Sequence, residues 1–260
     1  MILHNKNEMN DIDNPLRHAC YMETQDRLEE NPILFAHRGG KAMAPENTLE
    51  AFQKALAYGS NALESDAWVT KCGHVVLHHD PRFGPIFKRR RINKCELSSL
   101  PTSIPTLESF YSKIVGTFNF SIDIKEEKAA KKILEISNDY SFPLEKLWMC
   151  HPSIEKLTLW RDLDPTVRLV NSTKLDSVKE GPERRIATLS QVGIDAFNMH
   201  FSEWNEALVA LCHRFGIRSF AWDAQEERQI KWLLRIGIDG IFSDHVERMN
   251  NALFNFRGKN

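Results

Sequence analysis

The sequence contains no long hydrophobic run and no export signal. Its apolar stretches fall well short of the roughly 20 consecutive residues that a helix needs to span a bilayer. Residues 1–31 are polar and charged, and they lack the apolar centre of a secretory signal peptide. We therefore expect a cytoplasmic protein without a membrane span, in which residues 1–31 form a polar N-terminal arm and residues 32–256 form a single domain.

Cysteine is also scarce, and its spacing excludes two kinds of site. The five cysteines are an odd number, lie far apart, and include no CxxC pair. This pattern argues against a disulfide framework and against a zinc site built from thiolates. We interpret the cysteines as scattered reduced thiols.

Neither sign of charge dominates the chain. It has 34 basic and 35 acidic residues, for a formal net charge of −1. Broad electrostatic attraction to nucleic acid or to an anionic membrane is therefore not expected. We expect a small-molecule partner instead, and the composition leaves the oligomeric state open.

Short β-rich runs alternate with helical stretches along the whole chain. We predict strands at 33–37, 61–69 (continued at 75–79), 118–124, 146–150, 166–170, 196–199, 218–222 and 240–242. Helices are predicted between and after them, the first at 47–58 with Asn47 as N-cap. Eight such units suit a (β/α)8 TIM barrel of the α/β class. The proline-containing stretch 80–104 forms an insertion after the second strand region. A doubly wound open sheet is the alternative architecture, but its GxGxxG fingerprint is absent.

Three carboxylates are predicted to converge inside this barrel. Glu64 and Asp66 lie two residues apart and share one face of the second strand, whereas Leu63 and Ala67 face the helices. Asp123 lies on the corresponding polar face of the third strand. Barrel active sites occupy the C-terminal ends of the strands, so these carboxylates indicate a site there.

Clustered carboxylates need a counter-charge, because like charges at close range oppose ionisation. A hard divalent cation, Mg²⁺ or Ca²⁺, would supply it with oxygen ligands from Glu64, Asp66 and Asp123. The alternative is a structural ion network in which Lys125 and Arg38 neutralise the carboxylates.

Two histidines end strands on the same rim. His37 ends the first predicted strand, and His79 ends the run at 75–79. Such a pair beside a cation suits acid and base catalysis of phosphodiester hydrolysis, which also needs positive charge at the phosphate. His74 and His78 fall on the opposite face of the strand pattern from His79 and are interpreted as surface or packing residues. His151 and His200 each follow a predicted strand, so each either lines the rim of the barrel or lies on the surface.

Several motifs resemble the glycerophosphodiester phosphodiesterase family, a TIM barrel like that of phosphatidylinositol phosphodiesterases. They are AHRGG at 36–40 with PENT at 45–48, ALESD at 62–66, TKCGHVV at 70–76 with HD at 79–80, IDIK at 122–125 and GIDGIFSD at 237–244. The first two blocks, at 36–48 and 62–80, are together highly specific for this family. The later two are weak indicators of the family when each is taken singly.

The resemblance implies metal-dependent cleavage of glycerophosphodiesters to glycerol 3-phosphate and an alcohol, within lipid and glycerol metabolism. It assigns acid/base catalysis to His37 and His79, metal binding to Glu64, Asp66 and Asp123, and phosphate contacts to Arg38 and Lys125. Trp222 would wall the glycerol pocket. It also places residues 88–91 (Lys-Arg-Arg-Arg) over the mouth of the site. Such a run is more often a solvated face, and our hypothesis is that it makes a peripheral contact with the headgroup or a membrane lipid phosphate.

The chain departs from the family pattern at three positions. A hydrophobic residue is usual where Ser65 stands, aspartate is usual at Cys72, and glutamate is usual at the third ligand position, Asp123. Because the side chain of Asp123 is shorter than that of glutamate, it would either shift the metal or admit another water ligand, and this affects which metal is preferred. Three alternatives remain at this point: a lysophospholipase D-like or sphingomyelinase D-like enzyme, a non-catalytic lipid- or phosphate-binding barrel, and an unrelated metal-dependent isomerase. Direct attack by water and a cyclic phosphate intermediate are both open.

Overall fold

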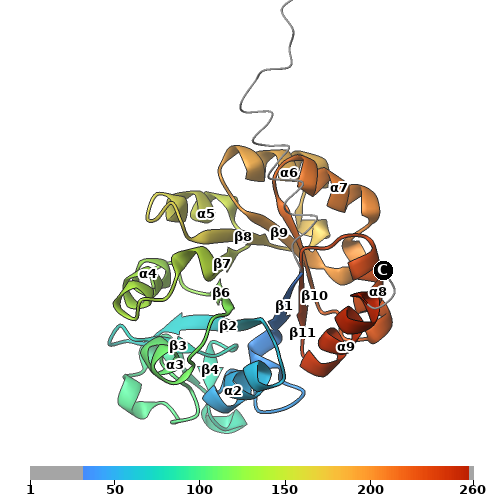
Figure 1. Cartoon of the computed structure of the whole chain (residues 1–260). Coiled ribbons are helices and arrows are strands. Elements are labelled where there is room, and N and C mark those ends of the chain that lie inside the picture. The colour runs from blue at the N-terminus through green and yellow to red at the C-terminus, as the bar shows by residue number, and fades with distance from the viewer. Residues whose placement is uncertain (1–31, 258–260) are drawn as a thin grey trace, which may run out of the picture.

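The computed structural model describes residues 32–257, so the predicted arm at 1–31 lies outside the described residues. Eight parallel strands close into a barrel with helices outside, as Figure 1 shows along the barrel axis. The barrel confirms the predicted fold class. Its strands, in order around the barrel, are β1 Ile33–Ala36, β2 Ala62–Val69, β6 Asn119–Ile124, β7 Leu147–His151, β8 Arg168–Ser172, β9 Ala196–His200, β10 Arg218–Trp222 and β11 Gly240–Ser243, which pairs back with β1.

Most helices lie close to their predicted positions. They are α2 Leu49–Ala57, α3 Leu107–Lys113, α4 Ala129–Asp139, α5 Ile154–Arg161, α6 Pro182–Gln191, α7 Glu206–Arg214, α8 Glu227–Arg235 and α9 Val246–Arg257. The prediction that Asn47 caps α2 is wrong. Thr48 is the N-cap, and its side chain accepts a hydrogen bond from the backbone N–H of Ala51.

The alternation of side chains along the strands produces two apolar layers. Inside the barrel, Phe35 stacks on Phe242 with ring centroids 4.3 Å apart, and Phe220 packs against both. A Cβ on Gly240 would lie 2.5 Å from the Phe220 ring, so only glycine fits there. Outside, Phe120 of β6 packs against the helix layer. The interior is thus filled by side chains.

The predicted insertion after the second strand is an ordered βα connection between β2 and α3. The strand β3 (Val75–Leu77) runs antiparallel to β2, and the short strands β4 (Arg82–Phe83) and β5 (Arg90–Arg91) form a hairpin. A small separate core holds this segment together, with Val76, Phe83, Ile92 and Cys95 buried. The insertion therefore has a fixed base next to the barrel.

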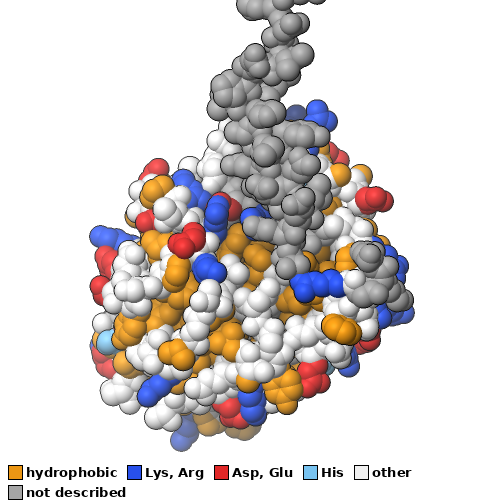
Figure 2. Space-filling model, in the orientation of Figure 1, with side chains coloured by type: hydrophobic (Ala, Val, Ile, Leu, Met, Phe, Trp, Pro, Cys, Tyr) orange, Lys and Arg blue, Asp and Glu red, His pale blue; other side chains and the backbone are white. Residues whose placement is uncertain are grey.

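The surface carries charges of both signs. On the face shown in Figure 2, basic and acidic side chains are scattered among apolar and uncharged ones without a broad field of one sign. Among residues 32–257, no helix is long and apolar enough to cross a bilayer.

Candidate active site

One cavity of about 200 Å³ lies within the barrel at the ends of the strands. All eight residues singled out from the sequence line it. They come from η1 (His37–Gly39), β2, β6 and β10 and from the residues just after β3 and β6. These residues are His37, Arg38, Glu64, Asp66, His79, Asp123, Lys125 and Trp222. The structure therefore brings together every side chain of the predicted site.

The turn that follows β1 has an unusual backbone. Arg38 adopts the left-handed region with φ of 51°, which costs a residue other than glycine roughly 1–2 kcal/mol. Gly39 also has positive φ, and a Cβ there would lie 2.8 Å from the Ala51 side chain. This conformation directs the backbone N–H of Arg38 to Glu64 Oε2 at 2.8 Å. The glycine thus allows the turn to hold Glu64 with a backbone donor.

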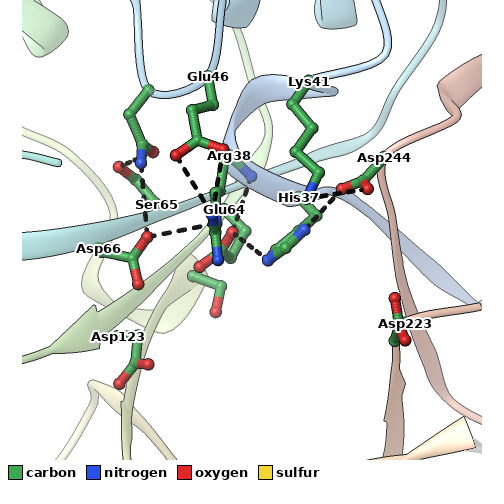
Figure 3. A network of polar contacts seen from close by, with 12 residues as sticks. His37, Arg38, Lys41, Glu46, Glu64, Ser65, Asp66, Asp123, Asp223 and Asp244 are labelled. Carbon is green, nitrogen blue, oxygen red and sulfur yellow. Dashed lines mark hydrogen bonds and ion pairs between the residues drawn. The ribbon is translucent and has the colours of Figure 1, made fainter. Parts of the chain in front are cut away.

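His37 is held between two carboxylates, as Figure 3 shows. Its Nδ1 lies 2.7 Å from Asp244 Oδ1, and its Nε2 lies 3.9 Å from Glu64 Oε2. Burial alone would lower the pKa of His37, but the charge of Glu64 and the hydrogen bond to Asp244 outweigh it and raise that pKa. Burial would raise the pKa of Asp244, yet the hydrogen bond to His37 lowers it. The pair therefore favours a protonated imidazole beside an ionised carboxylate.

The carboxylates of the cavity are neutralised by two basic side chains. Lys125 Nζ lies 2.9 Å from Asp66 Oδ1 and also contacts Asp123, while Arg38 Nε lies 3.7 Å from Asp66 Oδ2. Burial would lower the pKa of Lys125, but the charges of Asp123 and Asp66 raise it. Glu64 pairs with neither of these side chains; its ion-pair partner is His37, whose Nε2 lies 3.9 Å from Glu64 Oε2. Burial, with the neighbouring carboxylates, raises the pKa of Glu64 to about 7.

Asn47 takes part in the site architecture instead of capping a helix. It precedes the N-cap Thr48 and adopts a positive φ of 55°. Its side-chain oxygen accepts a hydrogen bond of 2.7 Å from Ser65, and its amide nitrogen lies 3.4 Å from Asp66 Oδ2. Ser65 faces away from the cavity. Where the family usually has a hydrophobic residue, its hydroxyl donates the hydrogen bond that holds Asn47 against β2.

The other histidines have separate partners. His79 lines the cavity with Nδ1 3.0 Å from Asp80 Oδ1. His74 lies 3.7 Å from Glu108, His151 Nδ1 accepts the N–H of Ser153, and His200 packs against Trp222. Of these four, only His79 lines the cavity, and His78 does not line it either.

Comparison with known proteins places the chain in a family. The model of the glycerophosphoryl diester phosphodiesterase family matches residues 37–248. The chain belongs to this family. This membership confirms the resemblance seen in the sequence and the prediction of a phosphoric diester hydrolase.

Individual relatives align with this chain over most of their own length. A glycerophosphodiester phosphodiesterase of Caldanaerobacter subterraneus subsp. tengcongensis is 25% identical, over 85% of this chain and 97% of the relative. The human lysophospholipase D GDPD1 is 21% identical, over 85% of this chain and 86% of the relative. The crystal structure of a glycerophosphoryl diester phosphodiesterase from Silicibacter pomeroyi superposes with a TM-score of 0.79 at 19% identity, covering 90% and 97% of the two chains, and shows the same fold.

Glycerophosphoryl diester phosphodiesterases generally use a divalent cation. The donor set here fits one by its chemistry, since Glu64, Asp66 and Asp123 offer hard oxygen ligands in one cavity. The raised pKa of Glu64 also indicates a carboxylate that lacks sufficient positive charge. Within residues 32–257, however, no three acidic, histidine or cysteine side chains form a ready-made cluster, and Lys125 stands between Asp66 and Asp123. The ion network considered as the alternative is thus what this structure contains.

Six residues of the site had no role in the prediction. Asp244 orients His37, and the cavity is also lined by Ser121, Cys150, Ser172, Asn198 and Phe242. Asn198 Nδ2 donates to Ser172 Oγ at 3.1 Å, while its buried Oδ1 has no hydrogen-bond partner among the described residues. The signal for Asn198 was available, because Phe197 and Met199 on either side of it face the helix layer.

Proposed function

We propose that this chain hydrolyses glycerophosphodiesters to glycerol 3-phosphate and an alcohol. The observation that carries the proposal is the position of His37, held by Asp244 and facing Glu64 in a cavity that also contains His79 and two cationic side chains. This is the combination of proton donor, proton acceptor and positive charge that cleavage of a phosphodiester requires. The relative from Caldanaerobacter, named for this activity, supports the substrate class.

His37 serves as the proton donor in this proposal. Its raised pKa favours the charged imidazole, which can protonate the departing oxygen while Asp244 holds the ring. His79, which lines the same cavity, takes the proton from the attacking group as that group attacks the phosphorus. Arg38 and Lys125 contact the phosphate oxygens, and Trp222 walls the glycerol moiety. A divalent cation, Mg²⁺ or Ca²⁺, held by Glu64, Asp66 and Asp123 would offset phosphate charge.

Product identification tests the proposal. Glycerophosphocholine, glycerophosphoethanolamine, lysophosphatidylcholine and sphingomyelin are each incubated with Mg²⁺, Ca²⁺ or chelator. We expect glycerol 3-phosphate from the two water-soluble diesters, only when a divalent cation is present. A transient cyclic phosphate in the same samples would identify an attacking substrate hydroxyl, whereas its absence would identify water. No turnover of any diester would overturn the proposal.

A second candidate, a lysophospholipase D-like activity, is favoured by one comparison. The human relative is named lysophospholipase D and aligns over 86% of its length. The same cavity residues would carry out the cleavage, so only the substrate differs. Choline released from lysophosphatidylcholine, with no turnover of glycerophosphocholine, would select this candidate.

Asn198 is expected to bind a glycerol hydroxyl. Its buried Oδ1 lacks a partner, and an unsatisfied buried acceptor costs about 1–3 kcal/mol, which a hydroxyl donor would remove. Asn198→Leu should therefore raise KM for glycerophosphocholine about tenfold or more. KM is compared with that for bis(4-nitrophenyl) phosphate, which has no glycerol and should be unaffected.

The matched control for this variant is Asn119→Leu. Asn119 accepts a hydrogen bond from Trp148 and does not line the cavity. Its replacement should lower stability and leave both KM values unchanged. Equal effects of Asn198→Leu on the two substrates would show that Asn198 does not bind glycerol.

A further inference from the structure

The apex of the β4–β5 hairpin presents two apolar side chains to solvent. Ile86 is 79% exposed and Phe87 is 97% exposed, the highest value among the large hydrophobic residues of the described part of the chain. Both lie in the short 3-10 turn between the two strands. Removing such surface from water is favourable, and adjacent exposed apolar side chains of this size commonly mark an interaction site.

The apolar apex is followed directly by a run of basic residues. Residues 88–91 are all exposed, and the segment 81–95 contains six basic residues and no acidic one, although the whole chain has a net charge of −1. Among residues 32–257, Lys88, Arg89 and Arg91 have no carboxylate partner. By contrast, Lys128 on the loop before α4 pairs with Glu126, and Lys131 pairs with Glu135. Within the described part of the chain, these three basic side chains of the hairpin therefore have no carboxylate to compensate their charge.

The base of the hairpin is fixed. Phe83 and Ile92, at its two ends, are buried in the small core of the insertion, and the Arg90 guanidinium lies 5.7 Å from the centre of the Phe83 ring. The hairpin starts three residues after His79, a lining residue of the cavity, and belongs to the βα connection between β2 and α3. Such connections surround the C-terminal mouth of a barrel, so the apex stands on the side of the molecule where the cavity opens.

We propose that this hairpin apex docks on a lipid surface that bears anionic headgroups. Ile86 and Phe87 enter the boundary between headgroups and acyl chains, while residues 88–91 contact the lipid phosphates. Nucleic acid would account for the basic run but not for two adjacent apolar side chains at the apex. The docking does not depend on the reaction proposed above, although it would hold the cavity close to a lipid interface.

Vesicle flotation with the full chain tests the proposal. We expect binding to vesicles of phosphatidylcholine with about one-third phosphatidylglycerol, little binding to pure phosphatidylcholine, and a strong decrease at high salt. Arg89→Gln with Arg91→Gln should lower the partition coefficient roughly 25-fold, since each basic residue near an anionic surface contributes about a factor of five. Ile86→Ser with Phe87→Ser should abolish binding at the same lipid concentration.

Matched controls separate docking from general surface effects. Phe254→Ser removes an aromatic side chain that is also exposed, on α9, and Lys128→Gln with Lys131→Gln removes two positive charges. Both control proteins should bind vesicles like the unchanged chain, and they and the Ile86→Ser with Phe87→Ser variant should keep the same activity on glycerophosphocholine. Equal binding by the hairpin variants and the unchanged chain, or binding to RNA but not to vesicles, would overturn the proposal.

Discussion

Replacing His37 by asparagine is expected to lower kcat on glycerophosphocholine by a factor of about 10²–10⁴, the usual contribution of a general acid. Asparagine keeps a side-chain donor near Asp244 but cannot deliver a proton to the leaving oxygen. The stability of the fold should change little, because the His37 side chain is partly exposed to the cavity. Steady-state kinetics and thermal unfolding of the variant measure both effects.

His74→Asn is the control, since His74 lies outside the cavity and pairs only with Glu108. It should keep full activity. Full activity of His37→Asn would mean that another group supplies the proton.

The role of Asp244 can be tested separately through the pH profile. The hydrogen bond to Asp244 raises the pKa of His37, so the charged imidazole, and with it the activity, is lost only as the pH rises through that raised value. Asp244→Asn should therefore move the alkaline limb of the kcat/KM profile to lower pH. A merely structural role would lower activity at all pH values without moving the limb.

Glu64→Gln is expected to have opposite effects on activity and on stability. Loss of one oxygen anion beside the proposed cation should lower kcat about 10²-fold or more. In chelator at pH 8, however, the same variant should be more stable than the unchanged protein by roughly 3 kcal/mol. This value corresponds to the difference between the pKa of about 7 in the folded protein and the ordinary 4.5. Glutamine can still accept the N–H of Arg38.

The sign of this effect follows from the direction of the pKa change. A raised pKa means that the folded protein binds the proton of Glu64 more tightly than the unfolded chain. Its contribution to stability is therefore complete below about pH 4.5 and is lost as the pH rises through 7. Denaturant unfolding at pH 4.5 and pH 8, with chelator, should show the difference between the two proteins only at pH 8.

The exposed Glu50 provides the control for this measurement, because Glu50→Gln should show no such pH dependence. Adding Mg²⁺ or Ca²⁺ should restore stability to the unchanged protein at pH 8 and not to Glu64→Gln. An identical response of the two proteins to pH would mean that Glu64 is not held in the environment described here.

The carboxylates of the site were predictable from the sequence because strand geometry is local. Side chains two apart must share a face, so Glu64 with Asp66, and Asp123 on the next strand, were assigned to the interior because the opposite face of each strand carries apolar residues. The barrel was predictable for the same reason, because each of the eight strand-helix units has its own local pattern of apolar residues.

The residues that were missed depend on contacts between distant parts of the chain. Asp244 meets His37 only because β11 pairs with β1, and nothing in the local sequence of either strand indicates that partner. Asn47 stands just before a helix and is a residue type that often caps helices. Its side chain instead contacts Ser65 and Asp66 on β2. Lys125 was predicted as a residue that could neutralise the carboxylates, but its position between Asp66 and Asp123 arises from two strands together.

The pairing of β1 with β11 also determines when during synthesis the site can form. Ala36 lies opposite Ser243, so the proton donor and the carboxylate that orients it come from opposite ends of the barrel sequence. A ribosome-bound chain that has not yet released its last strand would contain His37, Glu64 and His79 but lack the closing strand. Such a chain cannot hold His37 in its working orientation, so activity should begin only after translation has passed Asp244 and the barrel has closed.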